Sequence, residues 1–426
     1  MRHAGRLVVL LTVCLVVVLQ GGPAGAQGRG ESVRGTLDQR GQDGDDAPVA
    51  GVEITVTTAA GEALGTVTTA EDGSFFLQLP GPGEYTATLD VLTLPPGVAL
   101  RDPDRATLEF SIRAGQSRPL LYPLGTGRAG GRGFGPRALQ LLVEGVKFGL
   151  IIAMTAIGLS LIFGTTGLVN FAHGELVTFG ALVAWFLNVR LGVPLVVAVV
   201  LAMLIGGLGG ATLDLGLWRP LRARGTGLIA MLVISIGMSL FVRYVFLYLF
   251  GGRTRPYGQF AVQRALDLGP IAIAPKDIVA IVLSLLVLAG VGLALARTRI
   301  GKAMRAVADN RDLAESSGID VQRVIVYVWF FGGSLATLGG VLLGLAEQVS
   351  WQMGFQLLLL MFAGVILGGL GTAFGALLGS LVVGVLVQTS TLFIPPELKN
   401  VGALLVLIVI LLIRPQGLLG DAERIG

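Results

Sequence analysis

Long apolar runs constrain this chain more than any other feature of its sequence. From residue 138 onwards, apolar stretches approach the ~20 residues that an α-helix needs to cross a bilayer, and short polar segments separate them. Only 14% of the 426 residues are charged, whereas soluble domains carry about 25%. The sequence therefore predicts an all-α polytopic membrane protein in this part of the chain.

Hydropathy divides the membrane part into nine candidate segments. They lie at 139–163, 174–189, 194–217, 227–250, 278–296, 324–346, 355–369, 374–394 and 401–413. Because the last segments are short, eight and nine crossings both fit the sequence, and we expect about eight to nine transmembrane helices.

The first 26 residues are typical of a secretory signal peptide. Arg2 and Arg6 precede the apolar run 7–19, which is too short to span a bilayer, and Ala-Gly-Ala at 24–26 suits cleavage before Gln27. An uncleaved signal anchor is the alternative. In both cases the chain that follows is expected outside the cytoplasm.

Residues 32–124 predict a small all-β domain. Val52, Ile54 and Val56 alternate with polar residues, as expected for half-buried strands, and glycine-rich turn signals such as Asp72-Gly73 separate the strands. We expect an extracytoplasmic antiparallel sandwich. A glycine-rich linker at 125–137 joins it to a membrane domain at 138–420.

The distribution of basic residues predicts the orientation of the membrane domain. With the β-domain outside, the chain lies inside after five crossings, in the loop between segments 278–296 and 324–346. This loop is the most basic in the chain, with Arg297, Arg299, Lys302, Arg305, Arg311 and Arg323. The positive-inside rule therefore agrees with the signal peptide. We predict a multi-pass protein of the bacterial plasma (inner) membrane.

A polar break, FGTTGLVNFAHGE at 163–175, separates the first two apolar segments. We expect Asn170 to cap a helix that resumes at Phe171, and Glu175 to favour the positive end of that helix. Interrupted helices of transporters often place such ends near the substrate path. The candidate pathway residues are Thr165, Thr166, Asn170, His173 and Glu175.

These pathway residues are expected to offer a substrate weak polar contacts rather than a strong ion pair, because tight binding would stall its release. The alternative is a structural role, in which Asn170, His173 and Glu175 only cap and hydrogen-bond the start of a helix. No metal site is predicted: His173 is the only histidine beyond the signal segment, and the only cysteine, Cys14, lies within that segment.

The basic loop predicts an amphipathic helix at 302–318, ended by Gly318. Its apolar stripe includes Met304, Val307 and Ala314, and charged residues surround it. We expect the stripe to enter a groove on a cytoplasmic partner; the alternative is a membrane-surface helix without a protein partner. The candidate coupling residues are Gly301, Lys302, Met304, Arg305, Val307, Ala308, Asn310, Ala314 and Gly318.

Residues 140–420 resemble the branched-chain amino-acid ABC permease family. The strings that carry the resemblance include FGTTGLVNFAHGE, RIGKAMRAVADNRDLAESSGIDVQRV and AGVILGGLGTAFGALLGSLVVGVL. The resemblance implies a type II importer fold and a coupling role for 302–318. It also implies a complex with a second, related permease, two cytoplasmic ATPases and an extracytoplasmic solute-binding protein.

The strings TAEDGSFFLQLPGPGEYTATL and APVAGVEITV of the β-domain resemble the carboxypeptidase regulatory-like, prealbumin-like sandwich. Such domains are usually non-catalytic. The permease family usually lacks this domain.

The function predicted from these features is substrate translocation in an ATP-driven importer of branched-chain amino acids, without a cofactor. The chain is not expected to be an enzyme, because it has no G-x-x-x-x-G-K-[ST] loop and ATP hydrolysis must occur on partner subunits. One alternative is a permease for urea or short amides. A channel or envelope sensor is a remote alternative, since a sensor would need a cytoplasmic signalling module.

Overall fold

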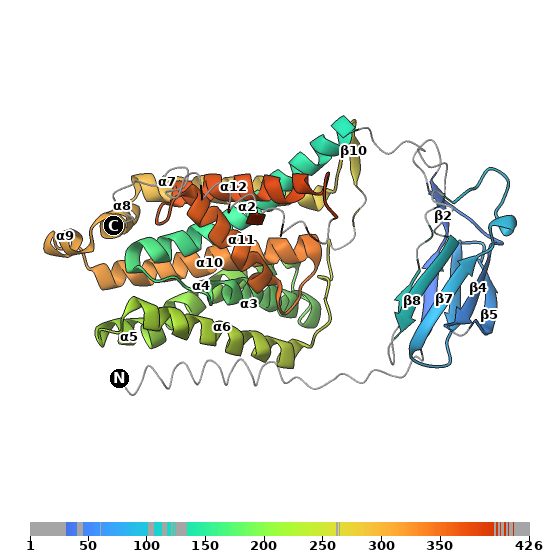
Figure 1. Cartoon of the computed structure of the whole chain (residues 1–426), viewed down its shortest axis with the longest axis horizontal. Coiled ribbons are helices and arrows are strands. Elements are labelled where there is room, and N and C mark those ends of the chain that lie inside the picture. Colours follow the sequence, from blue (N-terminus) through green and yellow to red (C-terminus); the bar gives the residue numbers. More distant parts are fainter. Residues whose placement is uncertain are drawn as a thin grey trace. The chain divides into compact units, whose positions relative to one another are not determined.

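The computed structural model divides into two compact units, one before residue 134 and one from Phe134 onwards (Figure 1). The described residues are 31–40, 46–59, 61–100, 106–112, 117–120, 122, 124, 134–260, 263, 265–395, 398, 401, 404, 405, 408 and 412. The predicted signal peptide, most of the predicted linker 125–137 and most of the last apolar segment, 401–413, lie outside them.

The first unit is a β-sandwich. Its strands are β1 Ser32–Thr36, β2 Asp38–Arg40, β3 Asp46–Pro48, β4 Glu53–Thr58, β5 Ala63–Thr68, β6 Ser74–Gln78, β7 Gly83–Leu89, β8 Thr107–Ile112 and β9 Ser117–Pro119. One sheet has the order β6-β1-β9 and another the order β5-β4-β7-β8, while β2 pairs with β3. Ile54 and Val56 are fully buried, and they share one core with Val33 of the other sheet. The alternation predicted for β4 is therefore confirmed.

Two tyrosines of this sandwich bond to its backbone through their hydroxyls. The Tyr85 hydroxyl donates to the Gly81 carbonyl at 2.6 Å, and the Tyr122 hydroxyl donates to the Ala87 carbonyl at 3.0 Å. Burial raises the pKa of Tyr122, so its hydroxyl stays protonated and remains a donor. Buried hydroxyls with partners of this kind fix how strands meet without leaving an unpaired polar group.

The second unit is helical. Its elements are α2 Phe134–Thr166, α3 His173–Trp185, the π-helix η3 Phe186–Arg190, α4 Leu195–Leu213, the π-helix η4 Asp214–Trp218, α5 Arg219–Ala223, α6 Leu228–Phe250, β10 Leu266–Leu268, β11 Ile271–Ile273, α7 Pro275–Arg297, α8 Arg299–Asp309, α9 Arg311–Ser316, α10 Val321–Glu347, α11 Met353–Gly368 and α12 Ala373–Ser390. Figure 1 shows α8 and α9 at one end of this unit and the β10–β11 hairpin at the other.

Six helical segments in the described part of the chain are long and apolar enough to cross a membrane, and α11 is a shorter apolar helix. The six are Phe134–Thr166, Leu195–Ala223, Leu228–Phe250, Pro275–Arg297, Val321–Glu347 and Ala373–Ser390. The polytopic α-helical fold predicted from hydropathy is therefore confirmed. The central helices α2 and α10 are mostly buried, whereas α6 and α7 leave most of their surface exposed.

Glycines let the central helices approach closely. Gly158 of α2 lies against Gly332 of α10, and Gly149 of α2 lies against Gly384 of α12. A side chain at Gly149, Gly158 or Gly384 would overlap the backbone of the facing helix, and one at Gly332 would be in tight contact with it. Small residues of this kind replace the hydrophobic effect as the means of helix association in lipid, because they extend van der Waals contact between backbones.

Enlarging one of these glycines should loosen the bundle. In Gly384→Ala the new methyl group would meet the Gly149 backbone, and overpacking of this kind costs about 1–3 kcal/mol. We expect a lower apparent Tm of the detergent-solubilised protein. Gly237→Ala on α6 is the matched control, since no described atom lies within 4 Å of its added Cβ. An equal Tm for the two variants would contradict the packing argument.

Candidate functional site

The polar break between α2 and α3 is a non-helical return segment. After Thr166 the chain leaves the helix at Gly167, which has a φ of +68°, and α3 begins at His173 with Ala172 as its N-cap. The prediction that the helix resumes at Phe171 with an Asn170 cap is wrong. The Asn170 Oδ1 atom accepts from the Ala172 N–H at 3.0 Å, so Asn170 closes a turn ahead of the helix instead of capping it.

This return segment carries the start of α3 deep into the bundle. The His173 imidazole Nε2 lies 3.1 Å from the Thr155 carbonyl oxygen, and Thr155 is about 16 Å along α2 from its last residue at 1.5 Å per residue. On the other side, the Phe171 N–H donates to the Ser235 hydroxyl of α6 at 3.1 Å. The predicted pathway residues therefore lie at different depths, with Thr165 and Thr166 at the end of α2 and His173 well inside.

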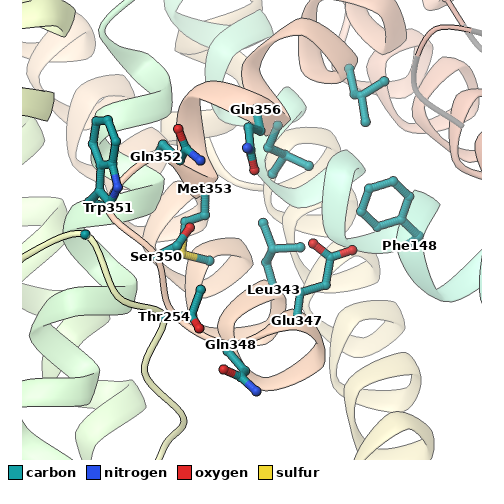
Figure 2. Close-up of a pocket in the computed structure, with 13 residues that line it drawn as sticks. Phe148, Thr254, Leu343, Glu347, Gln348, Ser350, Trp351, Gln352, Met353 and Gln356 are labelled. Carbon is teal, nitrogen blue, oxygen red and sulfur yellow. The ribbon is translucent and has the colours of Figure 1, made fainter. Parts of the chain in front are cut away.

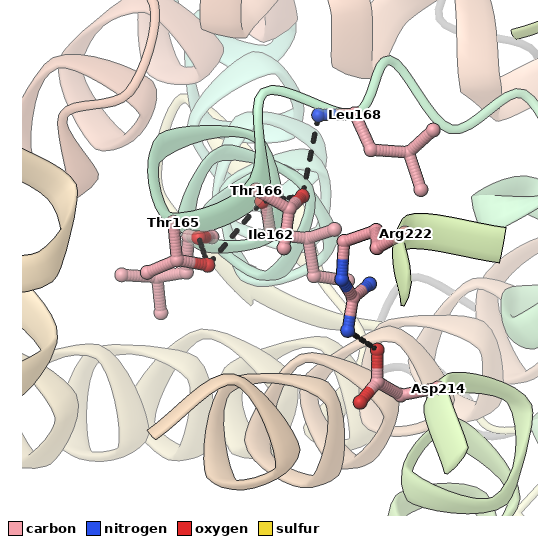
Figure 3. Close-up of polar contacts among 7 residues, drawn as sticks. Ile162, Thr165, Thr166, Leu168, Asp214 and Arg222 are labelled. Atoms are coloured by element: carbon pink, nitrogen blue, oxygen red, sulfur yellow. Dashed lines mark hydrogen bonds and ion pairs between the residues drawn. The ribbon is translucent and has the colours of Figure 1, made fainter. Parts of the chain in front are cut away.

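The threonines of the break bond to their own helix (Figure 3). The Thr165 hydroxyl donates to the Leu161 carbonyl at 2.9 Å, and the Thr166 hydroxyl donates to the Ile162 carbonyl at 2.6 Å. Thr166 also accepts from the Leu168 N–H at 3.2 Å. In this conformation both hydroxyls stabilise the end of α2.

Figure 3 also shows a buried ion pair on one side of the α4–η4–α5 segment. Arg222 contacts Asp214 at 2.6 Å, and the side chains are 8% and 0% exposed. The two residues lie eight positions apart on one continuous helical segment, so this pair spans about two turns of that segment and does not join two separate helices.

Glu175 joins α3 to α6 through a second buried ion pair. Its Oε1 atom accepts from Ser239 Oγ at 2.9 Å and from Arg243 Nε at 3.2 Å, and Arg243 Nη2 donates to Ser239 Oγ at 3.0 Å. The Arg243 guanidinium lies 3.5 Å from the centre of the Phe355 ring of α11. Within the protein Glu175 is therefore held in a buried ion pair, and the expectation that it offers a substrate only weak polar contacts stays a prediction.

Arg243 is absent from the pathway residues predicted above, although the sequence holds a signal for it. Arg243 is the only charged residue in the apolar segment 227–250. An ionisable residue inside a membrane segment marks a functional site by default, because its burial is costly unless a partner compensates for it. The sequence does not indicate that the partner of Arg243 is Glu175, which lies 68 positions earlier.

A cavity of about 300 Å³ opens where α10 gives way to α11 (Figure 2). Its lining combines polar side chains with apolar ones. The residues are Phe148, Gly252, Thr254, Leu343, Glu347, Gln348, Ser350, Trp351, Gln352, Met353, Gln356, Leu357 and Leu360. Gln348 has a backbone φ of +76°, which costs energy in a residue with a side chain and is typical of functional sites. No motif had predicted this cavity.

The first turn of α11 lies between this cavity and the Glu175–Arg243 pair. Met353 and Gln356 line the cavity, whereas Phe355 covers Arg243. The Gly354 N–H donates to the Thr178 hydroxyl of α3 at 3.0 Å. The same turn therefore forms a wall of the cavity and contacts the helix that carries Glu175.

The predicted coupling segment is two helices and not one. Asn310 has an extended backbone that ends α8, and its side chain accepts from the Leu313 N–H at 2.9 Å to begin α9. Gly318, at φ +84°, follows the end of α9. The prediction of one continuous helix over 302–318 is wrong because this asparagine caps a new helix in the middle of the segment.

The apolar stripe of this segment is already covered by the chain itself. Met304, Val307 and Ala314 are no more than 3% exposed and belong to the core of the helical unit. The expectation that this stripe enters a groove on a partner is wrong, because α8 packs against α2, α7 and α10. Gly301 is buried against the end of α7, and Ala308 is half-buried. The exposed coupling residues are Lys302, Arg305, Asn310 and Gly318.

In the described part of the chain, no group of three or more His, Cys, Asp and Glu side chains is placed to hold a metal ion. The site is thus a set of hydrogen-bonded and ion-paired groups within a helical bundle, beside a cavity with mixed polar and apolar walls. Such groups can position and exchange charged partners, and the described site offers no nucleophile with an adjacent base.

Residues 141–411 match the family model described as "Branched-chain amino acid transport system / permease component". The chain is 30% identical to the high-affinity branched-chain amino acid transport system permease protein BraD of Pseudomonas aeruginosa over 299 residues, which cover 67% of this chain and 96% of BraD. It is 31% identical to the corresponding protein LivH of Escherichia coli K12, with the same coverage.

A relative from Methanocaldococcus jannaschii, described as a probable branched-chain amino acid transport permease protein LivH, is 27% identical over 66% of this chain and 92% of its own length. About a third of this chain lies outside each alignment. The match to the family model extends over more than half of the chain and follows the helical unit. The chain therefore belongs to the family of permease components of branched-chain amino acid transport systems.

Proposed function

We propose that this chain is the translocating subunit of an ATP-driven importer of branched-chain amino acids. The observation that carries the proposal is the similarity to permeases of that name over nearly their whole length. The chain itself is a transport component and not an enzyme. A permease of the ABC type works with other components of its transport system, and ATP hydrolysis belongs to those components.

The proposed complex contains a second related permease, two cytoplasmic ATPases and an extracytoplasmic solute-binding protein. The chain is a multi-pass protein of the bacterial inner membrane. We further propose a signal peptide at 1–26, an extracytoplasmic carboxypeptidase regulatory-like domain at 32–124, a linker at 125–137 and the permease domain at 138–420. The basic loop between α7 and α10 supports an inward orientation of α8 and α9.

Uptake by the reconstituted complex tests this function. The proteoliposomes contain the permease pair and the ATPases, and the binding protein is present with them. They should accumulate labelled leucine, isoleucine and valine when ATP is supplied on the side of the membrane where the ATPases lie. Urea should not accumulate. Transport of urea or short amides without transport of leucine would replace the amino-acid function by the alternative one.

The break between α2 and α3 is proposed to form part of the substrate path. Replacing Asn170 by Leu removes the acceptor for the Ala172 N–H. A loss of turn bonding alone costs about 1 kcal/mol and lowers only the amount of folded protein. A pathway role should in addition lower leucine uptake per folded complex, measured as uptake divided by the monodisperse complex recovered from the same membranes.

The matched control for this variant is Asn188→Leu. Asn188 is also buried and also bonds to backbone, at Val193 and Gly258, but it lies in η3, beyond the C-terminal end of α3. It should lower the folded amount without changing uptake per folded complex. If both variants keep wild-type uptake per folded complex, Asn170 has a structural role only.

We propose that the ATPases bind the exposed surface of α8 and α9. Leu313 is the apolar centre of this surface. Leu313 is 64% exposed among charged neighbours, and an apolar side chain buried at an interface contributes about 1.5–3 kcal/mol. Leu313→Asp should therefore reduce ATPase co-purification and uptake about tenfold or more while the permease stays folded.

Two further variants give this test its contrast. Val307→Asp places a charge in the core of the unit, where Val307 is 2% exposed, and should reduce the amount of folded permease itself. Leu92→Asp changes a leucine that is 93% exposed in the β unit and should affect neither quantity. Normal ATPase recovery with Leu313→Asp would exclude this docking surface.

A further inference from the structure

The buried Glu175–Arg243 pair is an unusual feature of the helical unit. Glu175 is 4% exposed and the Arg243 side chain 10% exposed, and the two lie on different helices of a membrane domain. A buried ion pair is weak evidence for stability, because desolvation of both charges offsets most of their attraction. Charged residues at such positions in membrane proteins mark pathways of ions and substrates.

One oxygen of this pair lacks a partner. Both hydrogen bonds to Glu175 end on Oε1, and Oε2 is buried without a hydrogen-bond partner among the described residues. A buried acceptor left unsatisfied costs about 1–3 kcal/mol, and more when it is charged. The carboxylate can therefore accept a further donor without giving up either of its present bonds.

We propose that Glu175 and Arg243 receive the two charged ends of one amino-acid substrate, with the ammonium group on Glu175 and the carboxylate on Arg243. This inference rests on the proposed amino-acid function and names the groups that recognise the substrate. A zwitterion has no net charge, so its insertion leaves the membrane interior as neutral as before. Each of the four charges then has an opposite partner, which avoids the large cost of a single unpaired charge.

Arginine has the chemistry for the carboxylate end. Its planar guanidinium presents parallel N–H donors that match the two oxygens of a carboxylate. In the present conformation Arg243 donates to Glu175 and Ser239. Movement of α6 away from α3 would free these donors for the substrate, while Oε2 of Glu175 accepts from its ammonium group.

The cavity beside the pair gives the substrate a place from which to enter. Trp351 lines the cavity and packs on Tyr244, the neighbour of Arg243, with ring centres 6.2 Å apart. Phe355, on the first turn of α11, covers the guanidinium face. A displacement of this turn would join the cavity to the ion pair, and Met353 and Leu357 would then supply apolar contact for a branched aliphatic side chain.

The competing explanation is that the pair only fastens α6 to α3. The chain offers a matched control, because Asp214 and Arg222 form a comparable buried pair within one helical segment and away from the cavity. We therefore compare Arg243→Gln and Glu175→Gln with Arg222→Gln. Leucine uptake by the full complex is divided by the amount of folded complex, and ATPase recovery confirms assembly.

The proposal expects Arg243→Gln and Glu175→Gln to lose about tenfold or more in uptake per folded complex, since a tenfold change corresponds to only 1.4 kcal/mol. Arg222→Gln should lower the folded amount and stay within about twofold of the wild type per folded complex. Wild-type uptake per folded complex in Arg243→Gln or Glu175→Gln would overturn the proposal.

A second measurement does not require removal of either charge. Ser239→Cys, in a Cys14→Ala background, places a thiol beside both charged groups with little change of volume. A small methanethiosulfonate reagent should modify this thiol during turnover, and saturating leucine should slow the modification. Ser284→Cys on α7 is the control, because Ser284 is equally buried and should stay unmodified. Modification that leucine does not slow, or no modification at all, would overturn the proposal.

The two measurements separate this inference from the proposed function. If the wild-type complex transports leucine, but uptake does not depend on Arg243 and leucine does not protect the thiol of the Ser239→Cys variant, the ion-pair inference alone fails. If the wild-type complex transports urea and not leucine, the amino-acid function fails first and the zwitterion site fails with it.

Discussion

The requirement that every backbone N–H and C=O inside a bilayer be bonded within the protein controls this structure. A continuous helix meets that requirement by itself, but the segment between α2 and α3 cannot. Side chains supply its missing acceptors: Thr166 to Leu168, Ser235 to Phe171 and Asn170 to Ala172. The polar residues of the break thus make a non-helical segment possible inside the membrane. That segment in turn places Glu175 deep in the bundle.

The helices of the bundle differ in how closely they pack. At glycine contacts such as Gly158 with Gly332 the backbones of α2 and α10 touch, so these helices are fixed relative to each other. By contrast, α6 exposes most of its surface. It contacts the return segment through Ser235 and α3 through Ser239 and Arg243, and its Phe250 packs on Trp185 of α3. Polar contacts can exchange partners in a way that interdigitated backbones cannot. A change in the position of α6 would therefore exchange polar partners at Ser239 and Arg243, whereas a change between α2 and α10 would separate packed backbones.

The features that depend on short stretches of chain were predictable from the sequence. Apolar run lengths identified the helices, alternation identified strand β4, and the polar motif located the break after α2. The apolar period of α8, with Met304 and Val307 on one face, was visible in the same way. The sequence did not show which surface this face contacts, because burial against a partner subunit and burial against α2 produce the same apolar period.

Contacts between residues far apart in the chain could not be predicted from the sequence, because a local pattern does not identify the partner. Arg243 is visible as a lone charge in an apolar segment, but its pairing with Glu175 depends on how far the return segment 167–172 reaches along α6. The start of α3 depended on a similar choice, since an asparagine before a helix suits both a cap and a turn. Here the turn is favoured, because Asn170 bonds to the N–H of Ala172 before the first helical residue.

The energetics of the buried pair indicate how a permease can recognise a substrate without holding it. Separating the pair in the empty protein leaves two uncompensated charges, which costs about 3–5 kcal/mol, so the closed arrangement is favoured when no substrate is present. A zwitterion offsets that cost only while both of its ends are engaged. Once the substrate leaves, Glu175 and Arg243 pair again, and this competing interaction keeps the affinity for the substrate low. A site on a transport path must bind its substrate weakly, because a tightly bound substrate would be released too slowly.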